Sequence, residues 1–136
     1  MGRRELRESI FQLLFMTEFN ATEEMATQRE LYLENIEDLQ EKDQTYIQTK
    51  FEKICEKLAE IDGKLNECSK GWKTTRMAKV DLTILRLAVF EVLYDEDVPT
   101  RVAINEAVEL AKKYGGDDSP AFINGVLGKV AKTLSA

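Results

Sequence analysis

The segment Val80–Tyr94 has the most continuous hydrophobic pattern in the chain. Its apolar side chains point to every side of a helix, which predicts a helix surrounded by other helices. The segment is shorter than the roughly 20 apolar residues that span a bilayer, and Asp81, Arg86 and Glu91 interrupt it. We therefore expect a buried central helix. Arg86 should have a carboxylate or carbonyl partner, because an unpaired buried charge is costly.

Apolar stripes at helical spacing precede and follow this segment. Arg3–Phe19 carries an aliphatic stripe and a second stripe of phenylalanines at every fourth position, which predicts a helix with two contact faces. Val102–Tyr114 predicts another helix, which ends at Gly115-Gly116. The last helix should open with Ser119 as its N-cap and Pro120 as its first residue. The two stripes of the first helix are Leu6, Ile10, Leu13 and Leu14, and Phe11, Phe15 and Phe19.

The middle of the chain predicts two more helices. Asn20–Ala26 is expected to be a loop, and Thr27 with Glu30 forms a capping box that starts a helix ending near Leu39. A third helix should begin at Asp43 or Gln44. It carries a seam with alternating steps of four and three residues, typical of a bundle or coiled coil, which Gly63 could end or bend. The seam residues are Ile47, Phe51, Ile54, Leu58, Ile61 and Leu65.

Composition narrows the class of protein. The chain has 136 residues, which is long enough for one domain, or two fused sub-bundles, with a hydrophobic core. Its net charge is −6. It contains no histidine, so nucleophile pairs and zinc or di-iron motifs that need histidine are excluded. The two cysteines, Cys55 and Cys68, lack a metal or redox spacing. With no visible signal peptide or membrane span, we expect a cytoplasmic protein with reduced thiols and no cofactor.

Two basic clusters stand out against the acidic background. Arg3, Arg4 and Arg7 form a cationic patch at the start of the first helix. Lys70–Lys79 is a second basic stretch and the best candidate boundary between sub-bundles. Trp72 lies in it and could stack on a base, although a large aromatic residue at a bundle junction more often packs. Glu18–Asp43 is acidic and is expected to face solvent, where it would repel a nucleic-acid backbone.

Specific motifs in the second half resemble the NusB (N-utilization substance B) family of bacterial transcription antitermination factors. INEAVELAK at residues 104–112 and FINGVL at residues 122–127 occur in that order. Trp72 and Arg76, an Asp81-x-x-Ile84-Leu85-Arg86 motif and Val98-Pro99 precede them. The first helix adds Arg3-Arg4, Arg7-Glu8 and Gln12-x-Leu14-Phe15. The resemblance covers nearly the whole chain, while residues 20–70 match only in helical pattern and length.

The resemblance implies an all-α domain over residues 1–136, with about six or seven helices in two three-helix sub-bundles around the central helix. The sub-bundles would comprise residues 1–70 and 71–136. It also implies no enzymatic activity. Family members bind boxA-type single-stranded RNA together with NusE, a ribosomal small-subunit protein, and help the RNA polymerase antitermination complex to read through terminators. The RNA-binding residues carried over are Arg3, Arg4, Arg7, Gln12, Asp118, Phe122 and Asn124, and the partner-binding residues are Phe15, Phe19 and Asp81.

Guanidinium groups can pair with phosphates, Phe122 can stack on an unpaired base, and Gln12 and Asn124 can hydrogen-bond base edges. The basic segment is shorter than in many members, so we expect weak RNA binding by the chain alone. Three alternatives remain. The chain could be an RNA-binding module of a ribosomal RNA cytosine methyltransferase, or a homodimer that masks its RNA face through the phenylalanine stripe. A carboxylate metal site at Glu106 and Glu109 is the least favoured.

Overall fold

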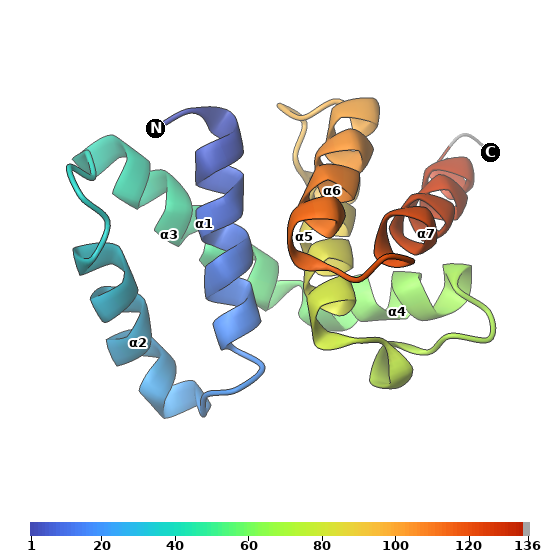
Figure 1. Cartoon of the computed structure of the whole chain (residues 1–136), viewed down its shortest axis with the longest axis horizontal. Coiled ribbons are helices and arrows are strands. Elements are labelled where there is room, and N and C mark those ends of the chain that lie inside the picture. The colour runs from blue at the N-terminus through green and yellow to red at the C-terminus, as the bar shows by residue number, and fades with distance from the viewer. Residues whose placement is uncertain (135–136) are drawn as a thin grey trace. The chain divides into compact units, whose positions relative to one another are not determined.

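The structure, a computed structural model, describes residues 1–134 except for the side chain of Thr22. These residues form seven α-helices and one 3₁₀ helix, with no strand among them (Figure 1). The all-α prediction is confirmed. The helices are α1 (Arg3–Met16), α2 (Thr22–Glu34), α3 (Glu41–Glu56), α4 (Leu58–Cys68), η1 (Thr74–Arg76), α5 (Lys79–Tyr94), α6 (Thr100–Tyr114) and α7 (Ser119–Leu134).

The chain divides into two compact units, residues 1–55 and 56–136. The division lies earlier than the boundary predicted at 70–71, so α4 belongs to the second unit. The first unit holds three helices, and the second holds four α-helices and η1. Residues 135 and 136 of the predicted second sub-bundle lie outside the described residues.

Polar contacts join the three helices of the first unit. The hydroxyl of Tyr32 on α2 donates a 2.8 Å hydrogen bond to Gln12 on α1. Arg29 on α2 pairs with Glu52 on α3 at 3.2 Å, and its guanidinium lies 5.7 Å from the centre of the Phe51 ring. Apolar residues from all three helices are buried in this unit, which include Ile10, Leu13, Leu33, Ile47 and Ile54. The aliphatic stripe of the first helix and the first half of the predicted seam therefore contribute to the core of this unit.

Helix α5 contacts α4, α6 and α7 in the second unit (Figure 1). Nine of its residues are buried, so the prediction of a buried central helix is confirmed. Arg86 has the expected carboxylate partner, since its Nε and a terminal nitrogen donate to the two oxygens of Asp62 on α4 at 2.9 and 2.8 Å. A bidentate arginine–carboxylate pair of this kind fixes the relative orientation of the two side chains in addition to attracting them electrostatically. It therefore fixes α5 against α4.

The second helix differs from the prediction. It begins at Thr22, so Thr27 and Glu30 lie inside α2 and do not form its capping box. Glu23 and Glu24 occupy the first turn, where negative side chains are stabilised by the helix dipole. The helix ends at Glu34 instead of near Leu39, and Asp38 adopts a left-handed φ of 56° in the connection that follows. The first helix is also shorter than predicted, because it ends at Met16 and not at Phe19.

The predicted third helix is two helices in the structure. It breaks at Lys57, whose φ of −103° and ψ of 6° leave the helical range, while Gly63 lies inside α4. The seam is shared between the two units, because Ile47 and Ile54 are buried on α3 and Ile61 and Leu65 on α4. The prediction of a single third helix is therefore wrong, and its seam contributes buried residues to both units.

The connection between α6 and α7 has the predicted glycine stop. Helix α6 ends at Tyr114, and Gly115 adopts an extended conformation. The Ser119 hydroxyl accepts a 3.1 Å hydrogen bond from the Gly116 amide. Helix α7 includes Ser119 as its first residue, one position earlier than predicted, which is within the usual uncertainty of a helix end. The connection therefore fixes where the first turn of α7 begins.

Candidate nucleic-acid interface

The predicted cationic patch lies on the first turns of α1, and its three arginines differ in exposure. Arg3 and Arg4 are exposed, whereas Arg7 is only 8% exposed. An exposed guanidinium can reach a phosphate without disturbing the fold. A buried guanidinium has given up most of its water and serves packing at least as much as binding. The accessible charge of the patch therefore comes from Arg3 and Arg4.

Gln12 lies two turns further along α1 and is half-buried. Its side-chain carbonyl accepts the hydrogen bond from Tyr32, which assigns the oxygen a protein partner. An amide has one acceptor group and two donor hydrogens. The hydrogen bond from Tyr32 therefore orients the Gln12 side chain.

The phenylalanine stripe of α1 changes from buried to exposed along the helix. Phe11 is 2% exposed, Phe15 is half-buried and Phe19, beyond the helix end, is 64% exposed. The Phe15 ring lies 6.1 Å from that of Phe11 and 5.0 Å from that of Phe19. The inner end of the stripe is thus core, and its outer end offers an aromatic surface.

Asp81 occupies the first turn of α5 in the second unit. Its Oδ1 is buried and has no hydrogen-bond partner. A buried polar atom without a partner costs free energy, so such an atom calls for an explanation. The helix N-terminus supplies a favourable field for this carboxylate, and a donor from a binding partner would satisfy the oxygen.

Three predicted RNA-binding residues lie at the start of α7. Asp118 immediately precedes the helix and is exposed, Phe122 is half-buried and Asn124 is exposed. Phe122 follows Asp118 by one turn, so the two lie on the same side. Phe122 and Asn124 lie on opposite edges of the buried stripe, each about 100° from Ile123. The structure thus places the α1 group in the first unit and the α7 group in the second.

The sequence admits Trp72 as a base-stacking residue, although it is not among the predicted site residues. It is 56% exposed, so it is not the packing residue favoured by the sequence. Its ring lies 6.1 Å from that of Phe122, at an angle of 71°. The lysines beside Trp72 in the sequence are the one feature there that points to nucleic-acid binding at this residue. Its exposure follows from tertiary structure, which local sequence does not report.

Gly125 and Gly128 have no packing requirement within the described chain. A Cβ atom added at either position would meet nothing within 4 Å. Each glycine inside a helix costs about 1 kcal/mol relative to alanine. Close helix packing in this chain therefore does not account for the two glycines.

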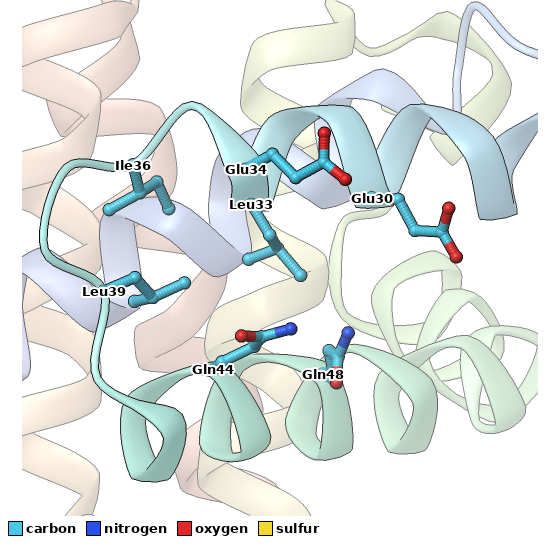
Figure 2. A pocket seen from close by; sticks show the side chains of 7 residues that line it. All are labelled: Glu30, Leu33, Glu34, Ile36, Leu39, Gln44 and Gln48. Atoms are coloured by element: carbon cyan, nitrogen blue, oxygen red, sulfur yellow. The ribbon is translucent and has the colours of Figure 1, made fainter.

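A pocket in the first unit has the wrong charge for RNA. Figure 2 shows Leu33 of α2 pointing toward α3, with Gln44 and Gln48 on the facing helix. Glu30 and Glu34 complete its polar lining, and no positively charged side chain lines it. Two carboxylates beside an apolar floor would repel a phosphate backbone. This pocket is therefore not part of the nucleic-acid interface.

Shifted pKa values in the second unit belong to structural groups. Burial raises the pKa of the Cys68 thiol, against the opposing charge of Lys64, so Cys68 stays protonated and is a poor nucleophile. The 2.6 Å hydrogen bond that Tyr94 donates to Glu60 raises the pKa of the tyrosine.

Across residues 1–134, no cluster of three or more acidic or cysteine side chains is placed to hold a metal ion. The helices described are all too short or too polar to cross a membrane.

Comparisons with known proteins cover nearly the whole chain. The model of the NusB family matches residues 4–132. The transcription antitermination protein NusB of Lachnoclostridium phytofermentans is 52% identical over 130 residues, which cover 96% of this chain and 98% of the relative. The protein of the same name from Agathobacter rectalis is 51% identical over 131 residues and covers 96% of this chain and 100% of its own.

Solved structures agree with the fold. NusB of T. maritima superposes with a TM-score of 0.86 at 33% identity, over 97% of this chain and 92% of that chain. A chain of a crystal structure of the antitermination factors NusB and NusE in complex with dsRNA has a TM-score of 0.82 at 21% identity, over 96% of each chain. The second likeness supports the fold alone.

Proposed function

The chain belongs to the NusB family, and we propose that it is a transcription antitermination factor, a non-enzymatic RNA-binding adaptor of the cytoplasm that works together with NusE. The observation that carries this proposal is the match of the family model to residues 4–132. Two relatives that are more than half identical bear the name of a transcription antitermination protein. The boxA-type RNA and the RNA polymerase antitermination complex are the corresponding targets.

The proposed RNA surface combines exposed charge with an accessible aromatic ring. Arg3 and Arg4 are exposed and would contact phosphates, which position a strand without reading its sequence. Phe122 would stack on an unpaired base, and Gln12 and Asn124 would bond base edges. Asp118 would accept from a base amine, and Arg7 would support the patch from its buried position.

The proposed NusE surface consists of Phe15, Phe19 and Asp81. Phe19 is 64% exposed, and large exposed aromatic side chains are enriched at protein interfaces. The Asp81 oxygen that lacks a partner would accept a hydrogen bond from NusE.

Replacement of Phe122 by alanine is expected to weaken binding of boxA-type RNA to the complex with NusE by about tenfold, because one base–aromatic stack is lost. Phe122 is half-buried, so thermal stability should change far less than RNA affinity. Gel-shift titrations and thermal unfolding of the same preparations measure the two effects. Phe122→Leu keeps most of the volume and should weaken binding nearly as much.

Val102→Ala is the matched control for Phe122→Ala, since Val102 is an exposed apolar residue of the same unit. It should leave RNA affinity unchanged. If Phe122→Ala unfolds the protein while Phe122→Leu binds RNA normally, Phe122 is a core residue and the α7 group is not an RNA surface.

Replacement of Arg3 and Arg4 together by alanine is expected to flatten the salt dependence of RNA binding. For single strands, the slope of log K against log salt changes by about 0.7 per lost phosphate contact, which gives about 1.4 for two. Titrations at several salt concentrations measure the slope. Lys42→Ala with Lys53→Ala removes two exposed charges from α3 and is the control. Equal slopes in both double variants would place the phosphate contacts elsewhere.

A further inference from the structure

We propose that Trp72 and Phe122 together form an aromatic platform on which two unpaired RNA bases stack. This inference rests on the RNA-binding function proposed above and adds Trp72 to its site. Trp72 belongs to the connection between α4 and η1, and Phe122 belongs to the first turns of α7. Their ring centres lie 6.1 Å apart, at an angle of 71°.

The edge-to-face arrangement leaves ring surface available. In such a pair the ring that supplies its edge keeps both of its faces away from the other ring. Trp72 is 56% exposed, although burial of an indole is strongly favourable, so the fold does not use this side chain as core. Every base has a flat face that can stack on an aromatic ring, whatever its sequence. An exposed indole beside a half-buried phenylalanine ring therefore suits a single strand with unstacked bases.

The connection that carries Trp72 is held by hydrogen bonds at both ends. The Trp72 amide donates to the Ser69 carbonyl at 2.9 Å, and the Ser69 hydroxyl donates to the Trp72 carbonyl at 2.6 Å. Gly71 turns the chain between them with a φ of +92°, a conformation that side chains disfavour. On the other side, the Thr74 amide donates to the side chain of Asn66 at 2.9 Å. The indole is thus presented on a preorganised turn, which lowers the entropy cost of binding.

The charges around the connection fit a polyanion. Lys70 and Lys73 flank Trp72 in the sequence, and Arg76 follows in η1; all three are exposed. Lys70 also lines a hollow with Lys129 of α7 and Glu67 of α4. In a chain with a net charge of −6, a local basic cluster favours a polyanion over an apolar partner, and the exposed indole within it adds a stacking surface that bases can use. Single-stranded RNA is therefore the occupant that this surface fits best.

The chain contains one tryptophan, so its fluorescence reports on the platform directly. Single-stranded boxA-type RNA, titrated into the complex with NusE, should quench this fluorescence with the same midpoint as a gel shift. The same RNA in a fully paired duplex should not quench it, because paired bases are already stacked. Trp72→Phe in the same complex supplies the background signal from NusE.

Trp72→Ala should weaken binding of the single strand by about 5- to 20-fold, the lower part of the range for one lost base–aromatic stack. Trp72→Phe should recover most of that loss. Tyr46→Ala, which removes an exposed aromatic residue of the first unit, should change nothing. Urea unfolding of Trp72→Ala should match the parent, since the side chain is mostly exposed.

The outcomes separate this inference from the proposed function. If Phe122→Ala weakens RNA binding but Trp72→Ala does not, and no quenching occurs, the platform is wrong and the RNA-binding function stands. If Trp72→Ala abolishes binding of NusE while RNA affinity of preformed complexes is normal, the surface binds protein and the platform is wrong. If the parent complex binds no RNA, the proposed function and the platform both fail.

Discussion

Asp62→Ala is expected to lower the free energy of unfolding by about 2 kcal/mol, less than the roughly 3–5 kcal/mol for removal of one partner from a fully buried ion pair, because this pair is only part-buried. Asp62 accepts two hydrogen bonds from Arg86, at 2.8 and 2.9 Å, and links α4 to α5. The two side chains are only 26% and 16% exposed, so the variant leaves a guanidinium with little access to water. Urea unfolding of both proteins measures the difference.

Glu109→Ala is the matched control for Asp62→Ala. Glu109 pairs with Lys112 on the surface of α6, and these side chains are 48% and 60% exposed. Exposed pairs contribute little, so the variant should stay within about 0.5 kcal/mol of the parent. If both variants cost the same, Arg86 is solvated in the folded protein and the pair does not hold α5 against α4.

The second half of the fold could be predicted well because its signals are local. Val80–Tyr94 is apolar on all sides, and α5 is buried as this pattern indicates. The glycines after Tyr114 and the Ser-Pro pair mark the end of α6 and the start of α7 to within two residues. Hydrophobic periodicity and terminal residues both report on neighbours along the chain, so no knowledge of tertiary contacts was needed.

The wrongly predicted helix ends lie where tertiary packing, rather than local sequence, determines the end of the helix. The seam from Ile47 to Leu65 is continuous in the sequence, yet the helix breaks at Lys57 and the two parts of the seam lie in different units. No proline or glycine marks that break. The capping box at Thr27 has the correct residues for a helix start, but α2 begins at Thr22 and includes it. A capping signal shows what a residue can do at a helix end and not where the helix ends.

The site could be predicted by residue type but not by exposure. Arg3, Arg4 and Arg7 look equivalent in the sequence, whereas Arg7 is buried in the structure. Conversely, the sequence favoured packing for Trp72, which the structure places at the surface beside Phe122. Proximity of the α1 and α7 groups on one RNA surface stays a prediction of the family resemblance.

Gly115→Ala is expected to destabilise the protein by about 2 kcal/mol, as typical for a methyl group forced into a filled space. A Cβ at this position would lie 2.6 Å from both Cβ and Oγ of Ser119 and 2.9 Å from the Ala111 carbonyl oxygen. These atoms belong to the backbone or lie next to it, so a rotamer change cannot relieve the contact. The start of α7 must move, and urea unfolding measures the cost.

Gly116→Ala is the control for Gly115→Ala, one residue away. A Cβ at Gly116 would meet nothing within 4 Å. Because alanine lowers the conformational entropy of the unfolded chain, the free energy of unfolding of this variant should be unchanged or slightly raised. Since Phe122 lies one turn into the displaced helix, Gly115→Ala should also weaken RNA binding by the complex with NusE, while Gly116→Ala should not. Equal stability of the two variants would mean that α6 and α7 adjust independently. In that case the glycine stop would not position the aromatic residue of the proposed RNA surface.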